Sequence, residues 1–415
     1  MILGEKNIHP VSLNRIKMKI GVWLSDCYQA TMGGGFSYTE RLISELSEFD
    51  YADGDVEIVF VSPLQQPSLL KNVICISQIP SVIYGIFKKS TFITDILRKI
   101  DSRILISRGL SRILKDTGIR IMLYPQQMAC IDPDFPFISM NWDIGHRSTY
   151  SFPEVISLKQ FKYRENFYNN VLPRALFVVV ESLSGKEEII KYTNIGEHKI
   201  RIVPLFAGAV ANMVIDDQSG ERILNELGLG KQSYFYYPAQ FWAHKNHYNL
   251  IKAFARYCRA TDNNDILVLS GSDKGNKSYI LNLIETEGLH DRVKVLGFVE
   301  NEAVHVLYKH AIALVMATHF GPTNMPPIEA MECDCPVVCS DLNGHKEILE
   351  DSAVYFNSFD IESISNALTN IRVNNDEYRK RIKERKLVTP FNIKDAVENL
   401  KNVLAEAVQI RCNWE

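Results

Sequence analysis

The stretch HFGPTNMPPIEAMECDCPVVCS, residues 319–340, decides the fold of this chain. It reads as a loop of Gly, Pro, Thr and Asn, a helix that opens at Pro326–Pro327, and a short apolar strand. Such a loop directs backbone N–H groups and a helix N-terminus at one point, which predicts an anion site. Glu329, in the first turn, would repel a phosphate but suits sugar hydroxyls. A diphosphate beside a ribose fits both features. The alternative is an ordinary strand-to-helix turn in which Glu329 only complements the helix dipole.

Short apolar runs alternate with amphipathic stretches on both sides of this motif. The runs are continuous rather than alternating, which is typical of parallel strands buried on both faces. With helical stretches between them, they predict an α/β chain of two doubly wound, Rossmann-like domains. The predicted strands are 19–25, 56–62, 73–77, 119–125, 136–142, 175–182 and 199–205 in the first half, and 233–239, 265–272, 292–298, 311–317, 336–341 and 353–357 in the second.

The predicted organisation has four parts. A tail over 1–17 precedes a first domain over 18–208, a second domain covers 209–390, and a helical segment covers 391–415. The boundary follows the last apolar strand of the first half, where a short Ala/Gly-rich and then polar stretch begins. The tail lacks the apolar segment of a secretion signal.

Composition excludes several function classes. Hydrophobic residues make up 46% and charged residues 23% of the 415 positions, as in ordinary globular proteins. A net charge of −3 gives no general attraction to nucleic acid. No apolar run reaches ~18 residues, so we expect no transmembrane helix and a cytoplasmic protein. Cys333, Cys335 and Cys339 lack the spacing of a metal site, and we expect buried free thiols and no bound metal.

Residues 86–115 are unusually basic, and Ile, Leu and Phe interleave with the charges. A basic amphipathic helix can lie on an anionic membrane surface, here the inner face of the cytoplasmic membrane. The alternative is a solvated helix that covers the sheet.

Lys245 lies in a loop between a predicted strand and a predicted helix. Its ammonium would face the carboxyl edge of the sheet, where open α/β folds bind ligands, and would stabilise charge on a leaving diphosphate. The alternative is a surface lysine near a helix start, where its charge is mildly unfavourable. Asn246 is the predicted N-cap of the helix that follows.

Two loops of the first domain are candidates for the same crevice. Gly34 and Gly35 follow the first strand, and glycines let backbone approach a ligand closely; a flexible turn is the alternative. Asp143 and His146 follow another strand and could orient an acceptor hydroxyl or touch a donor. They could equally be ordinary polar loop residues, with Arg147 pairing with Asp143.

Three segments together resemble a known family. PPIEAMECDCPVV (326–338), YPAQFWAHKNH (237–247) and MGGGF (32–36) stand in the order of motifs of the family 4 retaining glycosyltransferases, also called glycosyl transferases group 1, which have the GT-B fold. The resemblance implies transfer of a sugar, with retention, from a nucleotide diphosphate sugar to a glycan or lipid-linked saccharide of a cell-surface polysaccharide such as lipopolysaccharide. It also implies that no metal or other cofactor is required.

The resemblance assigns roles to the parts of the chain. The first domain would bind the acceptor, the second the donor, and the terminal helix would return toward the first domain. The implied catalytic residues are Lys245, His146 and Asp143. The implied donor-binding residues are Gly34, Gly35, Gln240, Lys245, Ser270, Gly271, Gly297, Phe298, Thr323, Asn324, Met325 and Glu329.

The chain departs from the family pattern at three polar positions. Gly321 stands where the family has a Glu eight residues before Glu329, Gln240 stands where it has an Arg, and Trp142 stands where many members have His. Either the donor site is rearranged, with contacts from Thr323, Asn324 and His319, or activity is lost; the retained Lys and Glu favour the first. A sugar nucleotide epimerase and a non-catalytic nucleotide-sugar-binding partner are the alternative functions.

Overall fold

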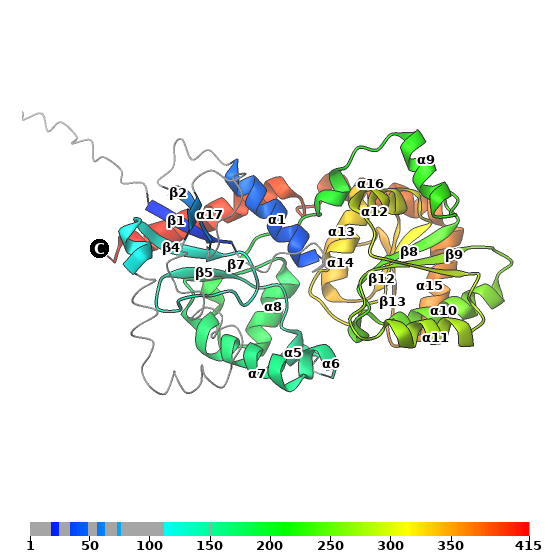
Figure 1. The fold of residues 1–415 in the computed structure, drawn as a ribbon, viewed down its shortest axis with the longest axis horizontal. Coiled ribbons are helices and arrows are strands. Elements are labelled where there is room, and N and C mark those ends of the chain that lie inside the picture. The colour runs from blue at the N-terminus through cyan, green and yellow to red at the C-terminus, as the bar shows by residue number, and fades with distance from the viewer. Residues whose placement is uncertain are drawn as a thin grey trace, which may run out of the picture.

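The computed structural model describes residues 18–24, 34–48, 56–62, 73–75, 112–149 and 151–414. They form two α/β domains that lie side by side (Figure 1). Each domain has one parallel sheet with helices packed around it. Every predicted strand is present, with ends that differ by a few residues, and the predicted fold class is confirmed.

The N-terminal sheet has the strand order β3-β2-β1-β4-β5-β6-β7, and all of its pairs are parallel. The first strand, β1, lies inside the sheet; β2 and β3 follow on one side of it, and β4 pairs with it on the other side. This reversal is a topological switch point, where open α/β sheets bind ligands beyond the strands' carboxyl ends. The strands are β1 (Met18–Trp23), β2 (Val56–Ser62), β3 (Val73–Cys75), β4 (Ile119–Tyr124), β5 (Phe137–Met140), β6 (Phe177–Val180) and β7 (Ile200–Ile202).

Helices flank this sheet. Most of them lie between consecutive strands in the sequence, as in other doubly wound folds. Among the described residues they are α1 (Gly34–Ser47), α5 (Gly145–Ser148), α6 (Pro153–Ile156), α7 (Leu158–Asn166) and α8 (Leu183–Tyr192), with shorter or irregular turns η2 (Phe167–Val171), η3 (Leu172–Arg174) and η4 (Glu197–Lys199).

The C-terminal sheet has the order β10-β9-β8-β11-β12-β13 and is also parallel. Its strands are β8 (Tyr234–Pro238), β9 (Ile266–Ser270), β10 (Val293–Gly297), β11 (Ala313–Met316), β12 (Val337–Ser340) and β13 (Ala353–Phe356). Its helices are α9 (Asp217–Glu226), α10 (His247–Ala260), α11 (Lys277–Thr286), α12 (Asn301–His310), α13 (Met325–Glu332), α14 (Asn343–Leu349), α15 (Ile361–Val373) and α16 (Asn375–Val388), with the turn η6 (Ala243–Lys245).

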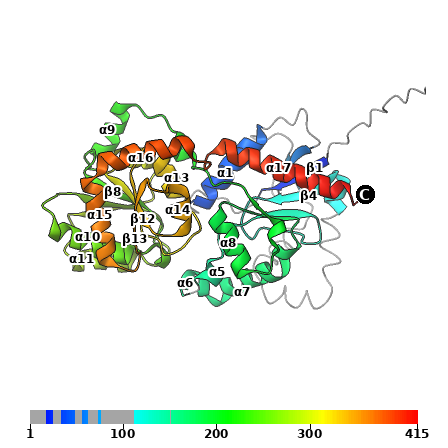
Figure 2. The ribbon, with the colours of Figure 1, turned by 180° about the vertical axis from the view of Figure 1, so that it is seen from behind.

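Two segments connect the domains. The first contains η5 (Ala209–Asn212) and runs from β7 to α9. The second leads from α16 into α17 (Ile393–Cys412), which lies along the N-terminal domain beside α1 (Figure 2). An ion pair fixes α17 there, because Arg201 Nε of β7 donates to Glu406 Oε2 over 2.8 Å. The exact domain boundaries stay predictions.

Two further predictions are limited by the described part of the chain. Of the basic stretch 86–115, residues 86–111 lie outside the described residues. Within the described ranges, no helix is long and apolar enough to cross a membrane. In the same ranges no group of three or more His, Cys, Asp or Glu side chains is arranged to hold a metal ion.

Candidate functional site

Loops at the carboxyl ends of both sheets meet between the domains. From the N-terminal side come the segments after β5 and β6, and from the C-terminal side the segments after β8, β11 and β12. Three contacts join them directly: Glu154 with His244, Glu181 with Thr323, and Glu347 with the start of α8. Most predicted site residues lie in or beside these loops.

Lys245 is half-buried at the end of η6. Its Nζ donates to Asn324 Oδ1 over 3.0 Å, and its carbonyl accepts from Tyr237 Oη over 2.6 Å. Burial lowers the pKa of Lys245 from 10.5 to about 8, although the negative charges of Asp143 and Glu154 oppose the shift. The side chain is therefore mostly a cation at pH 7 and becomes neutral on the alkaline side of pH 8.

Asn246 is the N-cap residue of α10, as predicted, although its side chain makes no capping hydrogen bond. Its φ of 58° is left-handed, a conformation that Asn tolerates better than most residues. Its Nδ2 instead donates to the carbonyls of Ala317, over 3.1 Å, and Ser358, over 2.8 Å. The buried amide therefore ties the Lys245 loop to the segments after β11 and β13.

Glu329 lies in the second turn of α13, not the first, because the helix begins one residue earlier, at Met325. Only 9% of Glu329 is exposed. Its Oε2 accepts from Tyr308 Oη over 2.8 Å, and its carboxylate also accepts from the backbone N–H of Gly208. Burial raises its pKa above the ordinary value, against these two hydrogen bonds. Glu329 thus joins α13 to the connecting segment at Gly208, and its role toward sugar hydroxyls stays a prediction.

Asp143 is brought toward Lys245, whose pKa it raises through its charge. Its Oδ1 accepts from Arg164 Nη1 over 2.6 Å and from the N–H of Gly145 over 2.9 Å. Burial alone would raise the pKa of Asp143, but Arg164 and these hydrogen bonds hold it below its ordinary value. The expected partner was wrong: Arg147 pairs with Glu165 over 2.6 Å, since Arg164 already satisfies Asp143.

His146 is placed behind the crevice loops. Only 1% of it is exposed, and its ring packs against Tyr168 and Phe161. Its Nε2 lies 3.1 Å from Glu165 Oε1. Burial lowers the pKa of His146 to about 4, so the ring is neutral at pH 7. The structure thus brings Asp143, and not His146, to the face opposite Lys245.

The remaining predicted residues divide between the site and its supports. Gly34 and Gly35 begin α1, and a Cβ on Gly35 would lie 2.6 Å from the ring of Trp142, so Trp142 itself requires the glycine. Gly271 has a φ of 147°, and its Cβ would lie 2.4 Å from Ala239 O. Two of the other predicted residues make side-chain hydrogen bonds: Ser270 Oγ with Tyr236 Oη, and Gln240 Oε1, which accepts from Trp242 Nε1. Gly297 is the last residue of β10, and the next residue, Phe298, is 54% exposed. The side chains of Thr323 and Met325 are buried.

Sequence reasoning missed the carboxylates that join the domains. Glu181, 8% exposed at the end of β6, accepts from the hydroxyl of Thr323, and burial raises its pKa to about 8. Glu154 of α6 accepts from the N–H of His244 over 2.9 Å and bonds its ring Nδ1. Glu347 of α14 accepts from the N–H groups of Leu183 and Ser184, over 2.7 and 2.9 Å. A charged residue directly after the apolar run FVVV was the one available signal.

His319 also lies at this junction. Its ring stacks between Phe152 and Phe359, and its Nδ1 lies 3.0 Å from Ser358 Oγ. It therefore belongs to an aromatic stack that spans the domains, because Phe152 comes from the N-terminal side and Phe359 from the C-terminal side.

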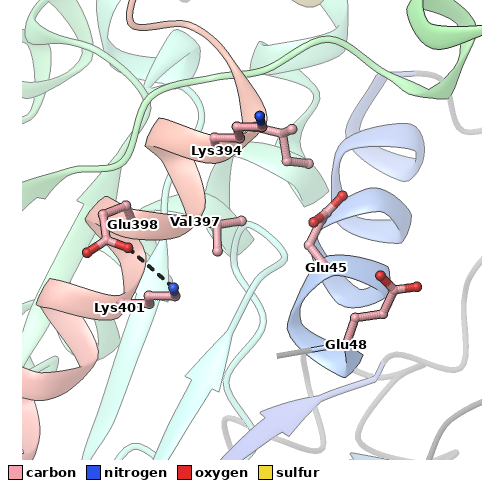
Figure 3. Close-up of a pocket in the computed structure, with 7 residues that line it drawn as sticks. Glu45, Glu48, Lys394, Val397, Glu398 and Lys401 are labelled. Atoms are coloured by element: carbon pink, nitrogen blue, oxygen red, sulfur yellow. Dashed lines mark hydrogen bonds and ion pairs between the residues drawn. The ribbon is translucent and has the colours of Figure 1, made fainter. Parts of the chain in front are cut away.

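A separate hollow lies between α1 and α17 (Figure 3). None of its lining residues is among the predicted site residues or the junction residues described above. Its lining mixes charges of both signs, and Glu398 and Lys401 pair with each other over 3.3 Å. The lining residues are Glu45, Glu48, Ile393, Lys394, Val397, Glu398 and Lys401.

Residues 220–388 match the family described as glycosyl transferases group 1. The match covers α9 to α16 and contains Lys245, Asn324 and Glu329. The C-terminal domain is a group 1 glycosyltransferase domain. The match confirms the resemblance for the two motifs that lie within it, 237–247 and 326–338.

Similar proteins agree with this assignment. The chain is 26% identical to O-antigen chain mannosyltransferase B of Escherichia coli over 52% of this chain and 57% of that protein. It is 26% identical to O-antigen chain mannosyltransferase RfbU of Salmonella typhimurium over 52% of this chain and 59% of that protein. The matches thus span little more than half the length of these relatives. The structure of Anabaena HepE in complex with UDP-glucose covers 94% of this chain and all of its own, with a TM-score of 0.67 and 14% identity, which shows the shared GT-B fold.

Proposed function

We propose that this protein is a retaining glycosyltransferase that moves a sugar from a nucleotide diphosphate sugar to a glycan or lipid-linked saccharide during assembly of a cell-surface polysaccharide. The observation that carries the proposal is the position of Lys245. Its ammonium is fixed 3.0 Å from Asn324, the residue that precedes α13, so a cation and the N-terminus of a helix converge. Both favour a diphosphate.

The C-terminal face would stabilise the leaving group. As the bond between the anomeric carbon and the diphosphate oxygen breaks, its electron pair goes to the nucleoside diphosphate, and Lys245 and the positive end of the α13 dipole would stabilise the growing charge. Pro326 and Pro327 have no backbone N–H, so in this first turn the dipole contributes more than backbone hydrogen bonds. Lys245 and the dipole would serve in place of a divalent cation, and we propose that the reaction needs no metal or other cofactor. The new bond forms between the acceptor oxygen and the anomeric carbon, and the acceptor proton passes to the departing phosphate.

The N-terminal face would hold the acceptor. Asp143 keeps its charge because Arg164 lowers its pKa, so it can accept a hydrogen bond from an acceptor hydroxyl. Its low proton affinity makes it a weak base, which is why the proton is assigned to the leaving phosphate. His146, buried and neutral, has no contact role in this scheme.

The substrate class rests on the relatives. The names of the two bacterial relatives describe O-antigen chain mannosyltransferases, and the similar Anabaena structure contains UDP-glucose. They support a nucleotide sugar as donor and a polysaccharide intermediate as acceptor. We also propose a cytoplasmic location at the inner membrane face, with contact through the basic residues 86–115.

The membrane contact has its own test. Binding to anionic liposomes should exceed binding to neutral ones and should weaken as salt rises. Reversing Arg103, Arg108 and Arg112 to Glu should abolish it without loss of transfer to a soluble acceptor analogue. Equal partitioning to both kinds of vesicle would reject the contact.

The proposed activity is tested by binding and then by transfer. Thermal unfolding is followed with a panel of UDP-, GDP- and dTDP-sugars; at ~100 times its dissociation constant the donor should add ~2.7 kcal/mol of stability. The selected donor is then incubated with lipid-linked saccharide acceptors, and the anomeric configuration of the product is read by NMR. Donor turnover without any acceptor would indicate an epimerase, and binding of none of the nucleotides would reject the proposal.

A further inference from the structure

Gly321 and Asn324 occupy one another's space in the loop before α13. Gly321 has a φ of 119°, and a Cβ placed on it would lie 2.8 Å from Asn324 Nδ2 and 3.0 Å from Asn324 Oδ1. A glutamate at 321, as in the family pattern, would therefore collide with the amide of Asn324. The carboxamide fills the place from which that glutamate would extend.

Asn324 holds a backbone conformation that ordinarily belongs to glycine. Its φ is 63° and its ψ is 138°, outside the regions that L-residues populate readily. Strained residues of this kind persist where surrounding contacts fix them. Here the contacts are made by the side chain, which bonds Lys245 on one side and His345 on the other.

The hydrogen bonds of His345 determine which way the Asn324 amide faces. His345 is fully buried, and its Nδ1 lies 2.8 Å from the carbonyl of Ser340. A carbonyl only accepts, so Nδ1 carries the proton, and the Nε2 of a neutral ring must then accept. Asn324 Nδ2 lies 3.2 Å from this Nε2 and donates to it. The Oδ1 is thereby turned toward the ammonium of Lys245. If the amide were rotated by 180°, its NH2 group would face the ammonium, and both groups are hydrogen-bond donors.

Packing keeps the ring in this place. Gly344, the residue before His345, lies so close to the loop that a Cβ would stand 1.1 Å from the carbonyl oxygen of Pro322. The start of α14 therefore rests directly on the backbone of the loop. Burial also lowers the pKa of His345 to about 4, so the ring stays neutral at any pH near 7.

We propose that His345 and Asn324 are positioning residues that aim Lys245 at the donor diphosphate, in place of the glutamate that this loop lacks at position 321. The inference rests on the proposed function for the identity of the donor. A neutral amide fixes the ammonium without neutralising it, whereas a carboxylate at the same point would form an ion pair with it. Lys245 thus keeps its charge for the ligand.

The first test measures the titration midpoint of Lys245 in the absence of any ligand. Lysines are labelled by reductive ¹³C-methylation, Lys245 is assigned with Lys245→Arg, and its titration midpoint is followed by NMR. Asn324→Asp should move the midpoint upward by at least one pH unit. His345→Leu, which removes the acceptor for Asn324, should also move it, and His345→Gln should restore most of the original value. The matched control is His305→Leu, since His305 is likewise buried and bonds the carbonyl of Val210, away from Lys245.

The second test uses nucleoside diphosphate binding, measured by calorimetry with UDP and GDP. Gly321→Glu alone should weaken binding at least tenfold because of the collision with Asn324. The double variant Gly321→Glu/Asn324→Gly should recover most of that loss. Thermal unfolding of each variant shows whether it is folded.

The outcomes separate the two proposals. A midpoint of Lys245 that is the same in wild type, Asn324→Asp and His345→Leu overturns the positioning role, whatever the protein binds. A double variant that binds no better than Gly321→Glu also overturns it. A wild-type protein that binds neither nucleotide while the midpoints move as expected rejects the proposed function and leaves the aiming of Lys245 standing.

Discussion

The two faces of the crevice differ in charge and in what holds them. The C-terminal face presents a cation, Lys245, fixed by the neutral side chain of Asn324. The N-terminal face presents two carboxyl groups, of which Asp143 is charged because its pKa is lowered and Glu181 is mostly protonated at pH 7 because its pKa is raised to about 8. A cation at a helix start suits an anionic leaving group, and carboxylates suit hydroxyl groups. Under the proposed function, this difference would assign the donor phosphates to the C-terminal domain and the acceptor to the N-terminal domain.

The largest expected effect that separates the two faces comes from Glu181 and is seen in the pH dependence of the free energy of unfolding. Its pKa of about 8 in the folded protein exceeds the ordinary 4.5, so the folded state binds more protons between these values. Stability contributed by this group is full below pH 4.5 and is lost as pH rises to about 8, by about 5 kcal/mol, since a tenfold change in proton affinity is about 1.4 kcal/mol.

Denaturant unfolding of wild type and Glu181→Gln from pH 4 to 9 measures this loss. Glutamine stays neutral and can still accept from Thr323, so the variant should lack the decline. Buried histidines whose pKa is lowered change stability with the opposite sign, but they do so in both proteins and cancel in the difference. Identical pH profiles would mean that Glu181 is ionised in the folded state.

The next effect in size concerns the cation of the other face. Lys245→Ala should lower turnover by ~100-fold or more, the scale of losing one preorganised electrostatic contact. The matched control is Lys231→Ala, an exposed lysine of the same domain that pairs with Glu221. Steady-state kinetics measures both. Near-normal turnover of the first variant would remove Lys245 from the proposed mechanism.

The contact between Gly344 at the start of α14 and the loop before α13 leaves no room for one added methyl group. Gly344→Ala places a Cβ 1.1 Å from Pro322 O, so α14 must shift, and we expect a loss of about 1–3 kcal/mol or more of unfolding free energy. Gly220→Ala is the control, since the nearest atom there is 3.8 Å away and the residue lies inside α9. The control should gain about 0.5–1 kcal/mol. Equal unfolding midpoints for the two variants would contradict the packing argument.

Glu329 gives the smallest expected change. Glu329→Gln keeps the size but weakens a charge-assisted acceptor, and donor affinity should fall by ~1–2 kcal/mol, since bonds to charged groups contribute about 1.5–3 kcal/mol. The variant Tyr308→Phe removes only the internal donor to Glu329. If calorimetry gives the same donor affinity for Glu329→Gln as for wild type, Glu329 does not bind the donor, and its role is only structural, in linking α13 to Gly208.

The sequence predicted more of the C-terminal face than of the N-terminal one. Continuous apolar runs located the strands of both sheets, and loop position located Lys245. The start of α13 was misjudged because the left-handed backbone of Asn324 lets the helix begin at Met325, which moves Glu329 into the second turn. Glu181 and Glu154 were not predicted, because their roles depend on which loops meet when the two domains pack. His345 was not predicted, because its role depends on how α14 packs against the loop before α13 within the C-terminal domain. The sequence pattern of one segment contains neither kind of information.

The most direct test of the account is the pH dependence of nucleoside diphosphate binding, measured by calorimetry from pH 6.5 to 9.5 with wild type and Lys245→Met. The pKa of Lys245 is about 8, so its charge is lost as pH rises through that value. Wild type should bind most tightly below pH 8 and lose affinity about tenfold for each further pH unit above it, while Lys245→Met binds weakly with no such decline. Equal affinities of the two proteins across this range would contradict the claim that Lys245 holds the diphosphate.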